Sequence, residues 1–554
     1  MRAERPIVVR PVPEPAALSA LGTLDPLHAR LYAARGVTAA AQLDYSLAHL
    51  APVGSLDNVE AGVQLLLDNR DRRIIVVGDF DVDGATSTAL MLRCLRTFGF
   101  TDVHYLVPNR FEYGYGLTPE IVRVAAGRHP ALIVTVDNGV SSVAGVAEAK
   151  RHGIAVLVTD HHLPGTELPV ADVIVNPNLD GSRFPSRSLA GVGVAFYLMA
   201  ALGRALEQRG RAGAAKVPAR YLDLVALGTV ADVVPLDYNN RILVHQGLER
   251  IRSGRTVAGI RALLTQYGRQ LSRTVSSDLG FVAGPRINAA GRLEDISIGI
   301  ECLLTDDEME AQQHARVLDT INRERRDIEA TMREQAFAYV KSLDAQKWPS
   351  CVCVYEESWH QGVVGLIAAR VREICHRPVI AFAREAQGRL KGSARSISGV
   401  HARDLLEAVS AMHPDLIIRF GGHAMAAGLT IATADYESFV EAAAAQLDRL
   451  YPDADFSGAI VSDGVLPETA FDLQFARSLR DAGPWGSGFP EPLWSGDFTV
   501  IEQRTVGENH LKLRVRPPDG SSIVDAIAFN QAGPAFRGVV QLAYRLDVNE
   551  FRGV

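Results

Sequence analysis

The sequence predicts an α/β protein: a parallel-sheet domain and a second α/β domain joined by a long helix, followed by a small β-barrel. Three patterns predict this class. Between about residues 70 and 235, near-continuous Val/Ile/Leu runs alternate with helical segments, which is typical of a doubly wound parallel sheet. Residues 306–344 lack Gly and Pro and carry many i,i+4 charge pairs, so they predict a long helix or a helical hairpin. After "PWGSGFPEPLW", short alternating strands such as "DFTVIEQRTV" and "LKLRVRP" favour an OB-fold.

In chain order, the segments read as an arm, two domains with a helix between them, and a barrel. The expected bounds are 1–50 for the arm, 51–305 for the first domain, 306–345 for the helix, 346–455 for the second domain and 456–554 for the barrel. The arm is rich in Pro and Ala, so we expect it to dock without chemistry of its own. Because the chain ends at "DVNEFRGV" within a predicted strand pair, we expect further residues beyond it in the natural protein.

Composition limits the class of protein. With 554 residues, of which 47% are hydrophobic, the chain can build several large cores. A net charge of −7 argues against a protein that coats nucleic acid by bulk charge, but it leaves room for a local basic groove beside an acidic metal site.

Cysteine usage and the N-terminus indicate the compartment. The five cysteines are Cys94, Cys302, Cys351, Cys353 and Cys375. They form no CxxC pair, so we expect reduced thiols. The N-terminus has no apolar signal region, and the longest apolar runs are the length of a strand. We therefore expect a soluble cytoplasmic protein without a membrane span.

Polar residues follow the predicted strands of the first domain. "RRIIVVGDFDVDG", "ALIVTVDNG" and "IAVLVTDHH" each read as a buried strand and a loop, and "YLDLVALGTVADVVPL" reads as a fourth strand-like run. In open α/β sheets, ligands bind at the carboxyl ends of the strands. We therefore expect the four following loops to meet at one edge of one sheet.

The first of these loops is rich in carboxylates. Asp79, Asp81 and Asp83 alternate directly after the strand, and Gly84 supplies the turn. Three carboxylates so close together repel one another, and a bound cation would compensate them. A solvated acidic loop is the alternative reading of this motif alone.

The other loops add candidates of weaker individual meaning. Taken alone, Asp137 in "VTVDNG" reads as a turn residue. His161 and His162 beside Asp160 suit Mn²⁺, Zn²⁺ or Fe²⁺, although an isolated His pair is more often a surface feature. Asp232 lies among apolar residues and needs a partner, for which a metal is one option.

The occurrence of all four motifs in one domain favours a metal site over the separate local explanations. Four strand ends would deliver about seven oxygen and nitrogen ligands to one edge, enough for two cations roughly 3.5–4 Å apart. Such a pair clamps a phosphate and activates a water for in-line attack on phosphorus. The pattern therefore predicts a two-metal phosphodiesterase.

The motifs resemble those of a known family. "GDFDVDGATS", "VTVDNG", "VTDHH" and "LGTVADVVPL" are similar, in this order, to the four motifs of the DHH phosphoesterase superfamily. Within it, "PNRFEYGYGL", "GFVAGPRINAAGRL", "GSARS", "FGGHAMAAG" and "PWGSGFPEP" resemble segments of the RecJ family of bacterial single-strand-specific 5′→3′ exonucleases. The resemblance covers nearly the whole chain and implies a DHH domain, a DHHA1 domain and an OB-fold.

The resemblance implies roles for the strand-end residues. Those carried over as ligands of two Mn²⁺ ions, with Mg²⁺ as substitute, are Asp79, Asp81, Asp83, Asp137, His161 and Asp232. Asp160 would orient His161 or its neighbour. His162 would contact the scissile phosphate or act as general acid toward the leaving 3′-oxygen.

The resemblance also implies DNA contacts outside the metal site. In the DHHA1 region these are Ser393, Arg395, Gly421, Gly422 and His423. Gly-Gly would let the backbone approach a phosphate, whereas a lone GGH would otherwise read as a tight turn.

Two further segments carry candidate contacts. Arg286, Asn288 and Arg292 in "GPRINAAGR" could grip the DNA backbone or bridge domains. In "NRFEYGYG", bases could stack on aromatic side chains beside an arginine, or the segment could be a packed aromatic loop. The residues concerned there are Arg110, Phe111, Tyr113 and Tyr115.

The expected function is a processive exonuclease that releases 5′-mononucleotides from single-stranded DNA in repair and recombination. Expected partners are single-stranded DNA, single-stranded-DNA-binding protein and a helicase, and the enzyme is expected to be a monomer. One alternative is a DHH phosphodiesterase for short oligonucleotides, cyclic dinucleotides or pyrophosphate, although such chains usually lack the barrel and the long helix. Another is a non-catalytic DNA-binding scaffold, although such relatives have lost metal ligands.

Overall fold

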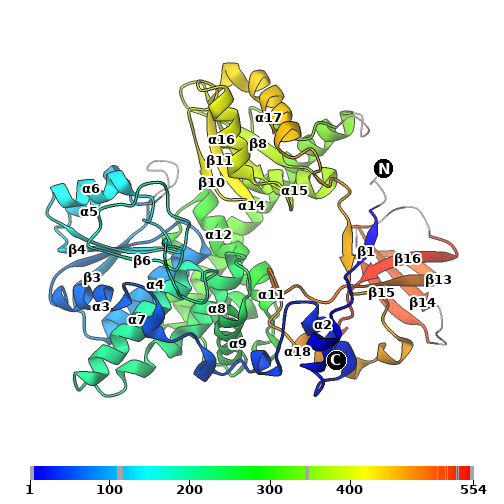
Figure 1. Cartoon of the computed structure of the whole chain (residues 1–554), viewed down its shortest axis with the longest axis horizontal. Coiled ribbons are helices and arrows are strands. Elements are labelled where there is room, and N and C mark those ends of the chain that lie inside the picture. Colours follow the sequence, from blue (N-terminus) through cyan, green and yellow to red (C-terminus); the bar gives the residue numbers. More distant parts are fainter. Residues whose placement is uncertain are drawn as a thin grey trace. The chain divides into compact units, whose positions relative to one another are not determined.

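The computed structural model describes residues 5–108, 116–343, 348–507, 509–517, 520, 522–531, 533 and 536–549. The chain divides into two compact units (Figure 1). The larger contains Val9–Asp319 and the chain from Val461 onward, and the smaller contains Thr320–Ile460 and the N-terminal residues as far as Val8.

A five-stranded parallel sheet of order β3-β2-β4-β5-β6 organises the first half of the larger unit. Its strands are β2 (Ile74–Val77), β3 (Val103–Leu106), β4 (Leu132–Val136), β5 (Ala155–Thr159) and β6 (Val173–Val175). β2 and β4 are buried along their whole length because Val, Ile and Leu fill positions on both faces. The parallel sheet predicted from these runs is confirmed.

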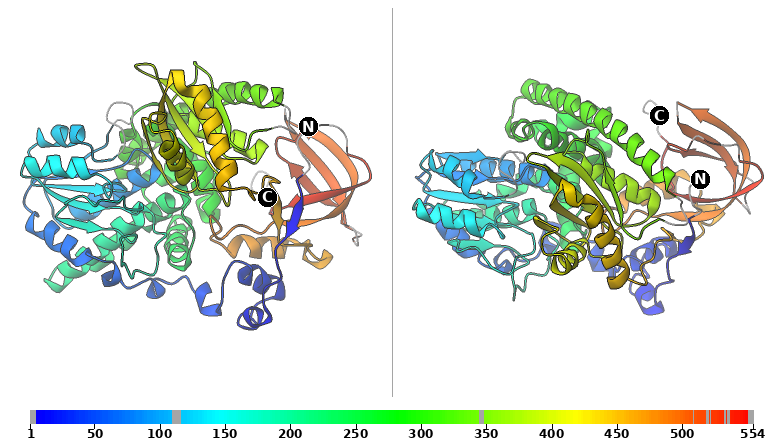
Figure 2. Two further views of the ribbon diagram at one scale, coloured as in Figure 1. Left: turned by 45° about the horizontal axis from the view of Figure 1, so that its top comes forward. Right: turned by 90° about the horizontal axis from the view of Figure 1, so that it is seen from above.

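Helices cover both faces of this sheet (Figure 2). On one face, Ile121 and Val146 from α5 and α6 join Ile133 of β4 in a buried cluster. On the other, Gly62 of α3 lies against Leu157 and against α7. The helices are α3 (Val59–Asp68), α4 (Val82–Thr97), α5 (Pro119–Ala126), α6 (Val143–Arg151) and α7 (Gly191–Gln208).

One predicted strand is wrong. The run "YLDLVALGTVADVVPL" forms helix α8 (Leu222–Ala231), and Asp232 is its C-terminal cap. All eight residues from Leu222 to Thr229 are buried. A helix that is apolar on every side has no 3.6-residue pattern, so its sequence looks like that of a buried strand.

The rest of the larger unit's first half is helical. Its helices are α9 (Tyr238–Arg252), α10 (Ala258–Thr265), α11 (Ser276–Asp278), α12 (Gly284–Leu293) and α13 (Ser297–Leu304). A π-helical turn over Leu279–Ala283 joins α11 to α12. The predicted connecting segment is a single helix of 35 residues, α14 (Glu308–Ser342), within which the division between the units falls.

The C-terminal part of the larger unit contains an antiparallel sheet of order β15-β14-β13-β16. Its strands are β13 (Trp494–Val506), β14 (His510–Arg516), β15 (Val524–Ala528) and β16 (Val539–Tyr544). Phe498, Leu511 and Leu513 fill its core, as the alternating pattern predicts. A bulge lies between Val500 and Glu502.

The N-terminal arm docks on the segment that precedes this sheet. Arg35, just after α2, pairs with the buried Asp463 at 2.8 Å, and the Tyr32 hydroxyl donates to Ala482 O at 2.8 Å. Tyr32 also lies against the stacked rings of Trp485 and Phe489. The elements concerned are α1 (Pro15–Ser19), α2 (Pro26–Ala33) and α18 (Leu473–Asp481).

The smaller unit is also α/β, with a five-stranded sheet of order β10-β11-β9-β8-β7 in which only β7 and β8 are parallel. The strands are β7 (Val352–Tyr355), β8 (Val379–Glu385), β9 (Arg389–Arg395), β10 (Arg419–Gly422) and β11 (Ala426–Ala432). The helices are α15 (Val364–Cys375), α16 (Ala402–Met412) and α17 (Tyr436–Leu450). Phe382 and Phe439 lie at the centre of its core.

Two short strands, β1 (Ile7–Val9) and β12 (Ile460–Ser462), pair with each other. Among the residues described, no helix is both long and apolar enough to cross a membrane.

Candidate metal centre

The loop after β2 brings three aspartates to the carboxyl edge of the parallel sheet. Asp81 caps α4, and its Oδ1 accepts the Gly84 N–H at 3.0 Å. Asp83 therefore lies in the first turn of a helix, and not in a loop as predicted. Asp79 is 4% exposed, and a Cβ at Gly84 would come within 2.5 Å of Asp79 O, so the turn requires glycine.

The N-terminus of α7 holds Asp83. The Gly191 and Val192 amides donate to its two carboxylate oxygens at 2.6 and 2.9 Å. These are among the N–H groups that a helix leaves unsatisfied at its start, and the helix dipole favours an anion there. Asp83 is 1% exposed, and the orientation of its carboxylate is thus fixed by α7 as well as by α4.

Asp137 follows β4 in a left-handed conformation, with φ of 62°, and is 2% exposed. A Cβ on Gly191 would lie 2.6 Å from Asp137 Cβ, so α7 reaches this residue only with glycine at that position. Asp137 is a turn residue, as its sequence context predicts, and its carboxylate also faces the cluster described below.

Asp160 organises the third loop. Its Oδ2 accepts the Val140 N–H at 2.9 Å, and its Oδ1 accepts the His161 N–H and lies 2.7 Å from His162 Nδ1. Of the two histidines, therefore, His162 is the one whose ring Asp160 orients. The sequence left this choice open.

The backbone of the same loop is held by two asparagines that the sequence analysis missed. Asn178 Nδ2 donates to His161 O at 2.6 Å, and Asn176 Nδ2 donates to His162 O at 2.9 Å. Both belong to "VNPN", which directly follows β6. Polar residues at the end of one more strand of the same sheet were the available signal.

His161 lies at the centre of the cluster. Its Nε2 is 3.1 Å from Asp137 Oδ1, 3.6 Å from Asp232 Oδ2 and 3.9 Å from Asp83 Oδ2. Potential ligand atoms lie within 4.8 Å of one another in three overlapping groups: Asp137, His161 and His162; Asp83, His161 and Asp232; and Asp79, Asp81 and Asp137. The structure thus brings together all the strand-end residues singled out in the sequence except Asp160, whose carboxylate bonds the His162 ring and the amides of its own loop and of Val140.

Electrostatics favour a cation in this cluster. Burial and the neighbouring Asp81 raise the pKa of Asp83 to about 7. Burial and the charge of Asp83 hold the pKa values of Asp137 and Asp232 well above the usual range. A bound divalent ion would relieve this repulsion, and a mixed imidazole and carboxylate donor set suits Mn²⁺. The residues present fit a metal centre.

The Asp160–His162 pair behaves differently. Burial lowers the pKa of His162, but the hydrogen bond and the charge of Asp160 outweigh it and raise that pKa to about 9. Burial raises the pKa of Asp160, but the hydrogen bond from His162, the charges of both histidines and the Val140 amide together outweigh it and lower that pKa to about 2. Both shifts favour an ion pair at neutral pH, with His162 protonated.

The "GPRINAAGR" segment is helix α12, and its three candidate residues have different surroundings. Arg286 is 4% exposed; its Nε lies 3.4 Å from Asp319 Oδ1 and its guanidinium lies over the Tyr267 ring. This position favours a bridge within the fold over a DNA contact. Asn288 Oδ1 accepts the Val82 N–H at 3.2 Å, and Arg292 is half-buried in the last turn.

In the smaller unit, the "GSARS" residues of β9 and the "GGH" residues at the end of β10 lie on either side of β11. Ser393 is paired across the sheet with Gly428, and Gly428 with Gly421, so the three form one row. The Arg395 guanidinium donates to Ser393 Oγ at 3.1 Å. A Cβ at Gly421 would meet no atom within 4 Å, so this row presents nearly bare backbone.

Gly422 and His423 begin the turn between β10 and β11. The His423 N–H donates to Ala426 O at 2.8 Å, which closes the turn, and Gly422 has a φ of 141°. The tight turn that a lone GGH predicts is therefore present beside the row. The aromatic candidates Arg110, Phe111, Tyr113 and Tyr115 lie outside the described residues.

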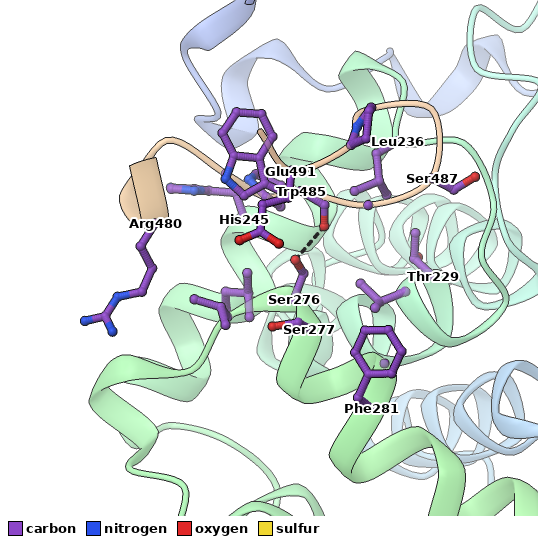
Figure 3. A pocket seen from close by; sticks show the side chains of 18 of the residues that line it. Thr229, Leu236, His245, Ser276, Ser277, Phe281, Arg480, Trp485, Ser487 and Glu491 are labelled. Carbon is purple, nitrogen blue, oxygen red and sulfur yellow. Dashed lines mark hydrogen bonds between the residues drawn. The ribbon is translucent and has the colours of Figure 1, made fainter. Parts of the chain in front are cut away.

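A pocket of about 410 Å³ adjoins the residues on either side of Asp232 (Figure 3). Val230 and Val233 line it on one side, and the "PWGSGFPEP" segment lines it on the other. Ser276 Oγ donates to Trp485 O at 2.6 Å, and the Leu236 N–H donates to Ser487 O at 2.7 Å. The pocket therefore lies where the C-terminal half of the unit joins its first half.

Comparisons with known proteins agree with this architecture. Family models match the DHH family N-terminal domain over residues 73–229, the DHHA1 domain over 349–449 and the RecJ OB domain over 462–554. The single-stranded-DNA-specific exonuclease RecJ of Salmonella typhimurium is 50% identical over 565 residues, which cover 100% of this chain and 98% of that protein.

Solved structures show the same likeness. RecJ from Thermus thermophilus in complex with Mn²⁺ has a TM-score of 0.82 at 31% identity, covering 100% of this chain and 78% of that one. The same protein in complex with Mg²⁺ has a TM-score of 0.75 at 30% identity, covering 99% of this chain and 77% of that one. The predicted fold class is thereby confirmed, and the chain belongs to the RecJ family.

Proposed function

We propose that this chain is a metal-dependent exonuclease that degrades single-stranded DNA from the 5′ end and releases 5′-mononucleotides. One observation carries the proposal: three carboxylates from separate elements lie within 3.9 Å of one imidazole nitrogen, at the carboxyl edge of a parallel sheet. The full-length match to single-stranded-DNA-specific exonucleases supports the choice of substrate.

The proposed cofactor is a pair of Mn²⁺ ions, with Mg²⁺ as substitute. Crystal structures of the Thermus thermophilus relative are complexes with these two ions. The proposed ligands are Asp79, Asp81, Asp83, Asp137, His161 and Asp232. When bound, such ions stabilise charge on a phosphodiester and lower the pKa of a water that attacks in line.

The protein's own groups would control the leaving group. His162 Nδ1 is committed to Asp160, so Nε2 is the nitrogen that would carry a proton to the leaving 3′-oxygen. The hydrogen bond and the charge of Asp160 raise the pKa of His162, which favours the protonated ring at neutral pH. Asp160 would act by orienting the ring, as the aspartate of a hydrolase triad does.

Contacts to the DNA backbone are proposed for the smaller unit. Ser393 and Arg395 offer a hydroxyl and a guanidinium beside the bare backbone of Gly421. Such a surface suits a phosphate, because nothing holds it away from the main-chain groups. Gly422 and His423 would complete it. For Arg292 and for the aromatic segment with Arg110, a DNA contact stays a prediction.

The biological setting is proposed from the family alone. We propose a cytoplasmic, monomeric enzyme of DNA repair and recombination that works with single-stranded-DNA-binding protein and a helicase.

Digestion of end-labelled oligonucleotides tests the activity. With Mn²⁺, a single strand labelled at its 5′ end should release labelled mononucleotide at once, whereas a 3′ label should be released last and a blunt duplex should resist. Early loss of the 3′ label would refute the polarity. Faster cleavage of a dinucleotide than of a long strand would favour a small-substrate phosphodiesterase.

Substitution of the cluster tests the site. Asp83→Ala and His161→Ala should bind a single strand but lose cleavage by several orders of magnitude, because each removes a proposed metal ligand. Unchanged cleavage in either variant would exclude the assigned site.

A further inference from the structure

Helix α12 packs directly on the loop that carries the first three aspartates. A Cβ at Gly291 would lie 1.9 Å from Phe80 O, so helix and loop are in backbone contact. One turn earlier, Asn288 Oδ1 accepts the Val82 N–H at 3.2 Å. Residues three apart share one face of a helix, so Gly291 and Asn288 form a single contact surface.

The hydrogen bond from Asn288 contacts the backbone between two of the proposed metal ligands. Val82 is the residue between Asp81 and Asp83, and it begins α4. The first N–H groups of a helix have no partner within the helix. Asp81 satisfies the Gly84 N–H and Asn288 satisfies that of Val82, so these two bonds fix the start of α4, from which Asp83 projects toward α7.

α12 is itself firmly held. Arg286, two residues before Asn288, is buried, lies 3.4 Å from Asp319 and donates to Val282 O. A Cβ on Gly284, at the start of the helix, would lie 3.4 Å from Ala231 Cβ, next in the chain to Asp232. The helix thus contacts the elements that carry the first and the last of the proposed metal ligands.

We propose that Asn288 is a positioning residue of the metal centre, which sets the direction of Asp81 and Asp83 through the Val82 amide, and is not a contact to DNA. This rests on the proposed function, because the aspartates that it positions are proposed metal ligands. Groups one step removed from a metal commonly change metal affinity or activity by about 10–100-fold.

The test compares two substitutions with opposite hydrogen-bonding capacity. Asn288→Leu keeps the branching at Cγ and removes the acceptor, whereas Asn288→Asp keeps an acceptor oxygen for the Val82 N–H. Asn69→Leu is the matched control. Asn69 is buried and bonds to the backbone at Leu65 O, but it lies before β2, at the opposite edge of the sheet.

Three measurements separate the roles. Mn²⁺ affinity of the metal-free protein is measured by titration calorimetry, and single-strand affinity is measured in EDTA by fluorescence anisotropy. Cleavage kinetics at saturating Mn²⁺ give kcat and KM. For Asn288→Leu we expect Mn²⁺ affinity to fall about 10–100-fold and kcat to fall with little change in KM. DNA affinity in EDTA should be unchanged, Asn288→Asp should recover most of the lost Mn²⁺ affinity, and the Asn69 variant should match wild type.

Four results would overturn the inference. They are an Asn288→Leu protein with normal Mn²⁺ affinity, one that loses DNA affinity in EDTA, an Asn288→Asp protein as impaired as the leucine variant, and an equal loss of Mn²⁺ affinity in Asn69→Leu. The asparagine-to-aspartate comparison still decides the matter if the leucine variant fails to fold. Failure of the proposed function is distinguishable, because wild-type protein would then bind no Mn²⁺ or leave the single strand intact.

Discussion

Replacing Asp83 with Asn tests whether a cation compensates the buried carboxylates. Burial and Asp81 raise the pKa of Asp83 from 3.8 to about 7, so the fold favours the protonated carboxyl. The protonated Asp83 carboxyl therefore contributes fully to the free energy of unfolding below pH 3.8, and this contribution is lost as pH rises through about 7. At 1.36 kcal/mol per pKa unit, the ionised group costs the metal-free protein about 4 kcal/mol at pH 8.

The uncharged asparagine side chain removes the cost of burying an ionised carboxylate, but it weakens one of the two hydrogen bonds from α7. Gly191 N and Val192 N each donate to one carboxylate oxygen, and asparagine offers a single oxygen. Loss of a hydrogen bond to a charged group costs about 1.5–3 kcal/mol. In EDTA at pH 8, Asp83→Asn should therefore be more stable than wild type by about 1–3 kcal/mol. At pH 5 the cost of Asp83 to wild type falls to about 1.6 kcal/mol, which the lost hydrogen bond offsets, so the gain should vanish.

Thermal or denaturant unfolding at both pH values, with EDTA and then with saturating MnCl₂, measures the effect. Mn²⁺ should reverse the order at pH 8, because wild type gains more from the ion than the variant. Asp223→Asn is the control: Asp223 is buried and bonds to Thr256 and Val257, outside the cluster, so Mn²⁺ should stabilise it as much as wild type. If Asp83→Asn is destabilised equally at both pH values in EDTA, Asp83 is a structural anchor and the reasoning fails.

Three further predictions concern neighbouring groups. His162→Gln should lower kcat by about 10²–10⁴-fold, because general-acid catalysis contributes that much, and should leave Mn²⁺ binding unchanged. Cleavage assays and calorimetry measure the two effects, and a parallel loss of Mn²⁺ affinity would make His162 a metal ligand instead. Asp160→Asn should lower the His162 pKa in metal-free protein from about 9 toward 6.5, since the Asp160 carboxylate raises that pKa. NMR titration of labelled histidines measures the pKa, and an unchanged value would contradict the assigned ion pair. Gly191→Ala should weaken Mn²⁺ binding, because its Cβ would come within 2.6 Å of Asp137. The control Gly54→Ala, whose Cβ would meet only Glu60 Oε1 at 3.9 Å, should leave Mn²⁺ binding unchanged.

The sequence predicted the parallel sheet and the residues at its edge because local patterns determine both. A fully apolar strand that ends in Asp or His is visible without tertiary information, and parallel strands necessarily bring their carboxyl ends together. The same reasoning failed at α8, where burial on every side removes the periodicity that distinguishes a helix from a strand. Asp232 nevertheless reaches the cluster, because it ends the helix at the same edge.

Contacts that join distant segments could not be predicted. Asn176 and Asn178 hold the backbone of His161 and His162 from another strand end, and although their place after a strand was a signal, their hydrogen-bond partners were not visible in the sequence. For Arg286 the sequence left a DNA contact and a bridge between domains as alternatives, and the structure buries its charge against Asp319. Side-chain direction depends on packing between elements, which a single sequence does not encode locally.

Helix α8 has a consequence for any screen that scores loss of activity. The helix is embedded in the core, because Leu224, Val225 and Leu227 are completely inaccessible to solvent. Asp232 lies at its C-terminal end. A cavity made beneath such a helix tilts it, and a tilt of a few degrees displaces the tip more than the base. We therefore expect inactivating substitutions to extend down α8, at hydrophobic positions remote from any ion or nucleotide, in proteins that still fold.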